Sequence, residues 1–164
     1  MPLYIAYTGP VGTTAPPTPI STGTSTKTLL QIATPATRQI RPVEWGISFA
    51  GYQAAEPVRV ELVETDVAAT VTAHAASGVQ PYDDPNAPAS AVVLGTTATG
   101  YNASAEGSVT SARHAALALV SPTTQWHFQW PLGREFRVAP DRFLRVRVTA
   151  PASVGAYAYV IWEE

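Results

Sequence analysis

The stretch that decides the fold is VEWGISF, residues 43–49. Large apolar side chains alternate there with small or polar ones, and the large ones are Val43, Trp45, Ile47 and Phe49. Successive side chains of a β-strand point to opposite faces, so this pattern predicts a strand with one face in the core.

The same period of two recurs on both sides of this stretch. It predicts strands over residues 28–33, 58–63, 70–75, 126–130, 136–138, 144–148 and 157–162. Residues 111–120 are rich in Ala and Leu, which suit a helix, but we favour a strand because the neighbouring segments are strands. Roughly eight or nine strands without an amphipathic helix predict an all-β, antiparallel β-sandwich, with a jelly roll preferred over an immunoglobulin-like sandwich.

The chain length of 164 residues predicts one domain. Residues 1–25 are rich in Pro and Thr and are expected to form an extended N-terminal arm, which lies on its own domain or on a neighbouring subunit. Residues 26–164 would then be the sandwich. Within it, residues 77–107 predict a long loop that is either functional or contains a short strand near 91–94.

Composition restricts the function. Charged residues make up 13% of the chain, against the ~25% of typical soluble domains, so subunit contact is the expected use of the surface. The net charge of −2 indicates no attraction to nucleic acid or to an anionic membrane. The chain has no Cys, which excludes disulfides and thiolate metal sites. The N-terminus does not resemble a secretory signal, and the longest apolar run, residues 115–120, is too short to span a bilayer.

Catalytic and cofactor motifs are missing from the sequence. It contains no Gly-x-Ser-x-Gly elbow and no phosphate-binding glycine loop. His74, His114 and His127 belong to separate predicted strands, and Asp83-Asp84 is typical of a polar turn. We therefore expect no enzyme activity, no catalytic residue, no metal site and no cofactor.

One basic cluster lies near the C-terminus, at Arg134, Arg137, Arg142, Arg145 and Arg147. Acidic residues interrupt it, so we expect these side chains to face solvent and to pair with acids rather than to bind single-stranded nucleic acid.

Most aromatic residues belong to alternating strands and are expected in the core. Tyr side chains outside these strands are typical of interface anchors. We therefore predict contacts with another surface for Leu3, Tyr4, Ile5 and Tyr7 of the arm, and for the loop residues Tyr52, Tyr82 and Tyr101.

Several stretches resemble small structural proteins encoded by tailed phages and prophages of GC-rich actinobacteria. They are TLLQI (28–32), VEWGISF (43–49), DPNAPAS (84–90), PLGRE (131–135), RVRVTAP (145–151) and YVIWEE (159–164). The resemblance implies a head decoration, or cement, protein that binds the major capsid protein of the assembled shell, with a homotrimer favoured. It also implies a place on the capsid surface of the virion, after assembly in the host cytoplasm, but it supplies no site residue. The alternative is a tail- or virion-associated module that binds carbohydrate on the host surface.

Overall fold

The computed structural model describes residues 1–11, 14–50 and 56–164, and most of their regular structure is strand. The 3-10 turn η1 spans Ala76–Gly78. No described helix is long and apolar enough to cross a membrane. The described strands are β1 (Leu3–Tyr7), β2 (Ile20–Ser21), β3 (Lys27–Ala33), β4 (Arg41–Phe49), β5 (Val58–Thr65), β6 (Thr70–Ala73), β7 (Val79–Pro81), β8 (Gly100–Ala105), β9 (Ala112–Val120), β10 (Gln125–Gln129), β11 (Phe143–Thr149) and β12 (Gly155–Glu163).

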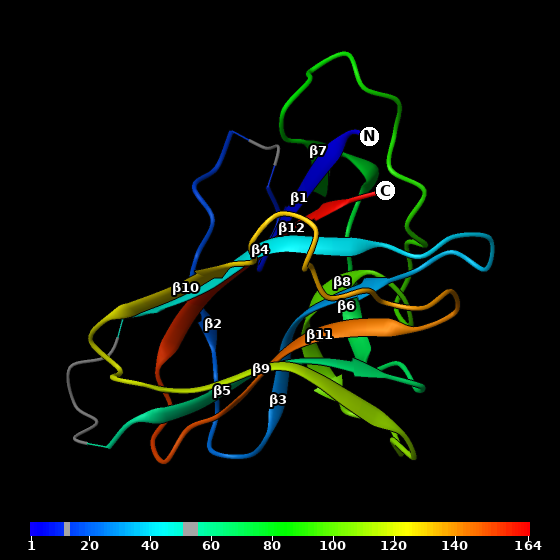
Figure 1. The fold of residues 1–164 in the computed structure, drawn as a ribbon. Coiled ribbons are helices and arrows are strands. Elements are labelled where there is room, and N and C mark those ends of the chain that lie inside the picture. The colour runs from blue at the N-terminus through cyan, green and yellow to red at the C-terminus, as the bar shows by residue number, and fades with distance from the viewer. Residues whose placement is uncertain (12–13, 51–55) are drawn as a thin grey trace.

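The strands form two antiparallel sheets that face each other (Figure 1). The first sheet has the order β10-β4-β12-β1-β7, with β2 paired to β12, and the second has the order β6-β8-β3-β11-β5-β9. The predicted all-β antiparallel sandwich is therefore confirmed, and the jelly roll stays a prediction. Residues 111–120 contribute β9, a strand as expected rather than a helix.

One hydrophobic core fills the space between the sheets. Trp45 and Trp162 enter it from the first sheet, and Leu62 and Leu144 enter it from the second, all fully buried. Burying a large apolar side chain stabilises the fold by about 1.5–3 kcal/mol, so this alternation provides much of the driving force for folding.

Val43 departs from the predicted alternation. In the pairing of β4 with β12, Ile161 is opposite Glu44 and Trp162 is opposite Pro42, so Val43 has no partner in β12. An extra residue of this kind is a β-bulge, which breaks the alternation locally. Val43 is consequently half-buried and does not share the full burial of Trp45.

Residues 3–7 form a core strand rather than the tip of a free arm. β1 pairs with β12 on one side and with β7 on the other, so it lies inside the first sheet. Further along, the Thr22 N–H donates to Val154 O at 2.9 Å. Residues 3–7 and 20–22 therefore pair with the sandwich, which matches the alternative that this segment lies on its own domain, while the boundary between residues 25 and 26 stays a prediction.

The predicted loop over residues 77–107 is shorter in the structure. η1 and β7 occupy its beginning and β8 its end, which leaves residues 82–99 without a named strand. The short strand expected near residues 91–94 is reduced to isolated bridges, of which Val93 with Ala33 is one.

Candidate functional site

The four N-terminal contact residues are largely used within the chain itself. Tyr4 and Ile5 are buried at 1% and 6% exposure, and Leu3 is half-buried. Neither Tyr4 nor Ile5 is therefore free to anchor an arm on a shell, which corrects that expectation. Tyr7 differs, because this residue remains 36% exposed at the end of β1.

The three loop tyrosines have different positions. Tyr82 is 56% exposed in the segment after β7 and remains a candidate contact. Tyr101 lies in β8 rather than in a loop, and its ring packs against His74 with centroids 4.9 Å apart. Tyr52 lies outside the described residues.

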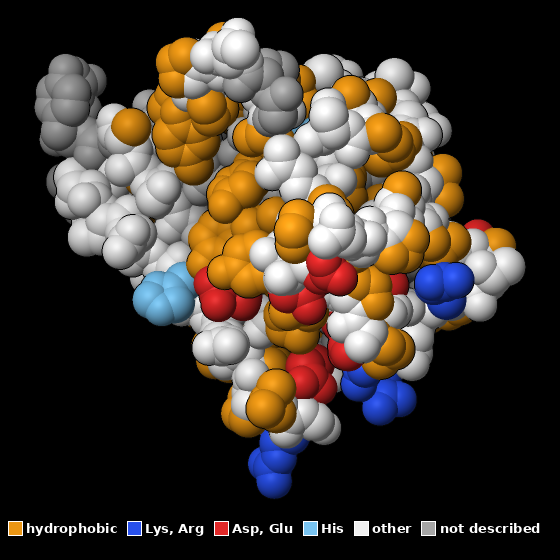
Figure 2. Space-filling model, turned by 90° about the horizontal axis from the view of Figure 1, so that it is seen from above, with side chains coloured by type: hydrophobic (Ala, Val, Ile, Leu, Met, Phe, Trp, Pro, Cys, Tyr) orange, Lys and Arg blue, Asp and Glu red, His pale blue; other side chains and the backbone are white. Residues whose placement is uncertain are grey.

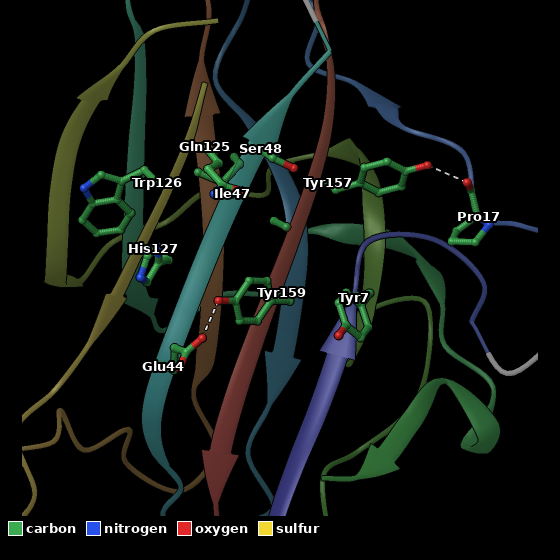
Figure 3. Close-up of a pocket in the computed structure, with 11 residues that line it drawn as sticks. Tyr7, Pro17, Glu44, Ile47, Ser48, Gln125, Trp126, His127, Tyr157 and Tyr159 are labelled. Carbon is green, nitrogen blue, oxygen red and sulfur yellow. Dashed lines mark hydrogen bonds between the residues drawn. The ribbon is translucent and has the colours of Figure 1, made fainter. Parts of the chain in front are cut away.

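A groove with a volume of about 570 Å³ lies over the outer face of the first sheet (Figure 3). β4, β10 and β12 form its floor, and the end of β1 and Pro17 border it. Figure 3 shows Trp126 and His127 on one side of β4, with Tyr7 and Tyr157 on the other. The lining residues are Tyr7, Pro17, Glu44, Ile47, Ser48, Gln125, Trp126, His127, Tyr157, Ala158 and Tyr159.

The alternation of β12 turns its tyrosines into this groove. Ala156, Ala158 and Val160 point into the core and are buried, so Tyr157 and Tyr159, which alternate with them, point outward. The Tyr159 ring lies over Gly46, where a Cβ atom would be 2.6 Å from Tyr159 Cε1. A glycine at this position of β4 therefore lets the ring lie against the sheet.

Hydrogen bonds fix two of the tyrosine rings. The Tyr159 hydroxyl donates to Glu44 at 2.5 Å, and the Tyr157 hydroxyl donates to Pro17 O at 2.5 Å. Burial and the interaction with Glu44 raise the pKa of Tyr159, so this hydroxyl stays protonated at neutral pH. The Tyr7 ring lies 5.9 Å from the Tyr159 ring, between centroids.

The three histidines do not come together. His74 is buried, with Nε2 2.9 Å from Tyr7 O, and His114 pairs with Glu61 at 2.9 Å. His127 lines the groove. No group of three or more potential metal ligands occurs among the described residues.

The predicted pairing of the arginines with acids holds for part of the cluster. Arg147 contacts Glu61 at 2.8 Å. Arg145 does not face solvent as expected, because it is fully buried and pairs with Glu106 at 3.4 Å. The segment that carries Glu106 covers this part of the second sheet.

A second candidate surface is the free edge of β9. β9 pairs with β5 on one side, and among the described residues no strand pairs with its other side. Leu117 and Leu119 on this edge strand are 61% and 71% exposed. An unpaired apolar edge of this kind is a template for contact with another chain.

Sequence reasoning missed the groove because it placed Tyr157 and Tyr159 in the core. The available signal was the small size of Ala156 and Ala158, which suits the crowded inner face. No protein-family model, curated protein or solved structure matches the chain. The function must therefore be inferred from the groove and the β9 edge.

Proposed function

We propose that the chain is a non-enzymatic structural protein of a phage virion, which decorates the capsid and stabilises the assembled shell. Its partners would be the major capsid protein and further copies of itself, with a trimer favoured. The resemblance of the sequence to phage structural proteins supports the phage setting. The low content of charged residues, at 13%, supports a surface made for subunit contact. In the view of Figure 2, hydrophobic side chains, other uncharged side chains and backbone cover most of the face, with the acidic and basic side chains gathered in its lower and right parts.

The β9 edge is the observation that carries this proposal. Proteins usually protect an edge strand with Lys, with Pro or by keeping the strand short. β9 is nine residues long, and its second half, residues 116–120, has no charged residue and no Pro. A strand of the partner could add to this edge, with Leu117 and Leu119 supplying the apolar contact.

Stabilisation of a shell requires no catalysis. A protein that binds the assembled shell and not its separated subunits lowers the free energy of the intact particle by mass action. Repetition of the same contact over a trimer would add avidity.

The test is binding to purified shells that lack this protein, measured by co-sedimentation and by the temperature at which the shells open. We expect the natural chain to bind and to raise that temperature. The L117K/L119K double variant should bind at least roughly tenfold more weakly, because it places two charges in a desolvated contact.

Val93→Lys is the matched control. Val93 is 47% exposed and bridges to Ala33 of β3, which is separated from β9 by β11 and β5 in the second sheet. The proposal would be refuted if the natural chain did not bind the shells. It would also be refuted if the double variant and the control bound them equally well.

A further inference from the structure

We infer that the groove on the outer face of the first sheet is a binding site for a neutral saccharide. Its volume of about 570 Å³ lies within the range of small-ligand sites, roughly 300–1,000 Å³. The groove belongs to the first sheet and the β9 edge to the second, so this inference does not depend on binding to a shell.

The tyrosines supply flat apolar surfaces in fixed positions. Tyr157 is tied to Pro17 O and Tyr159 to Glu44, while Tyr7 packs beside Tyr159. Aromatic rings offer apolar faces against which the C–H face of a sugar ring can pack. Because these rings are already held, little conformational entropy would be lost when a ligand binds.

Polar side chains with unused hydrogen-bonding groups lie in the same groove. Ser48, Gln125 and His127 form no side-chain hydrogen bond with the described part of the chain, and Glu44 uses Oε1 alone. A hydroxyl, an amide, an imidazole and a carboxylate oxygen therefore offer both donors and acceptors. Sugar hydroxyls also donate and accept, so a saccharide matches this combination of apolar rings and free polar groups.

The charges in the groove select against an acidic sugar. Glu44 is the one carboxylate among the lining residues, and neither Lys nor Arg is among them. The carboxylate of a uronic acid would meet the charge of Glu44 without a compensating cation, which is unfavourable. Glycoside hydrolysis commonly uses a pair of carboxyl groups, so a lining with one favours binding without cleavage.

The experiment is a glycan array followed by a ¹H–¹⁵N NMR titration of the full chain. The NMR probes are the β-1,4-linked N-acetylglucosamine tetrasaccharide, cellotetraose, mannotetraose and any further neutral glycan found on the array, with tetragalacturonate as the acidic probe. We expect a neutral glycan to shift the signals of Tyr157, Tyr159 and His127, with a Kd on the order of 0.1–1 mM. Failure of every neutral glycan to shift these signals at roughly ten times that concentration would overturn the inference, and so would tetragalacturonate binding as tightly as the neutral glycans.

The Q125A/H127A double variant tests which residues bind. Both side chains are exposed on β10, so the fold should survive, and we expect the affinity for the bound glycan to fall at least roughly tenfold. Gln129→Ala is the matched control, because Gln129 lies on the same strand and face but does not line the groove. Unchanged affinity in the double variant would also refute the inference.

The two proposals can fail separately. We expect Q125A/H127A to keep full occupancy on shells, and L117K/L119K to keep its glycan affinity. If glycan binding is found and shell binding is not, the groove inference stands and the capsid proposal falls; the reverse result rejects the groove alone.

Discussion

The Tyr4 hydroxyl donates a hydrogen bond of 2.8 Å to the carbonyl oxygen of Pro88, 84 residues later in the chain. Tyr4 belongs to β1, and Pro88 lies in the irregular segment of residues 82–99. The Leu3 N–H adds a second link, 2.9 Å from Asp83 Oδ1. The N-terminal strand therefore holds the longest irregular connection of the described fold in place.

We expect Tyr4→Phe to reduce the free energy of unfolding by about 1 kcal/mol, because the Pro88 carbonyl oxygen loses its hydrogen-bond donor while the ring stays packed. Amide hydrogen exchange should accelerate over residues 83–92, and chemical denaturation would give the loss of stability. Tyr7→Phe is the control, since the Tyr7 hydroxyl makes no hydrogen bond within the described part of the chain. Equal effects of the two variants would contradict this role of Tyr4.

We expect Gln31→Leu to destabilise the fold by about 2–3 kcal/mol. Gln31 is fully buried, donates to Ala98 O at 2.6 Å and accepts from the Ala69 N–H at 2.8 Å. Leucine fills a similar volume but leaves both backbone groups without this partner. Chemical denaturation checks the prediction, and Gln129→Leu at an exposed site should change stability by less than about 0.5 kcal/mol.

We expect Glu106→Ala to cost about 2–3 kcal/mol, because it leaves the buried Arg145 guanidinium without its carboxylate. Burial lowers the pKa of Arg145 to about 10, so the side chain is still charged at neutral pH. Glu106 also accepts from the backbone and hydroxyl of Thr28, both at 2.6 Å. In a double-mutant cycle measured by chemical denaturation, E106A/R145M should lose less unfolding free energy than the sum of the losses in E106A and R145M. Strict additivity would show that the pair is not coupled.

We expect stability to fall as the pH drops below 6.5, in part because of His74. Burial lowers the pKa of His74 from 6.5, so the unfolded chain takes up a proton before the folded chain does. The stabilisation that neutral His74 contributes is therefore complete above pH 6.5, and it is lost as the pH falls from 6.5 towards the pKa of His74 in the folded state. Tyr7 O and the Tyr101 ring contact the imidazole, and Gly78 lies against its Nδ1 side.

Melting temperatures between about pH 5 and 7.5 test this expectation. His74→Gln should flatten the profile in this range, whereas Gln129→Ala, at an exposed position that does not titrate, should leave it unchanged. Hydrogen bonds from Thr110 and Ser111 hold the pKa of Asp66 at about 2, so that carboxylate does not titrate in the same range. A wild-type profile identical to that of His74→Gln would contradict the prediction.

Local alternation predicted most of the central strands, including β4, β5, β11 and β12. It was less informative where a strand depends on its partners. Leu3–Tyr7 was assigned to an arm because a Pro/Thr tract follows it. In the structure this segment pairs with β12 at the far end of the chain, where Leu3 lies opposite Glu163. No local pattern indicates a pairing over such a separation.

The sequence was also misleading for polar residues on strands. Gln31 and Arg145 lie opposite each other in the pairing of β3 with β11, on positions that alternation assigns to the outer face. Both are fully buried, because the segments carrying Ala98 and Glu106 cover that face. Periodicity identifies which side chains share a face but not whether another segment covers it.

By itself, the sequence determined the fold class of this protein, because the period of two in hydrophobicity is a local consequence of strand geometry. It also indicated a surface with little charge. The tertiary structure alone decided where a ligand or partner can bind. The groove requires Tyr159, Glu44 and His127 from three strands to lie side by side, and the exposed edge requires β9 to be the last strand of its sheet. Both depend on pairing between distant segments, which the order of residues along one strand does not specify.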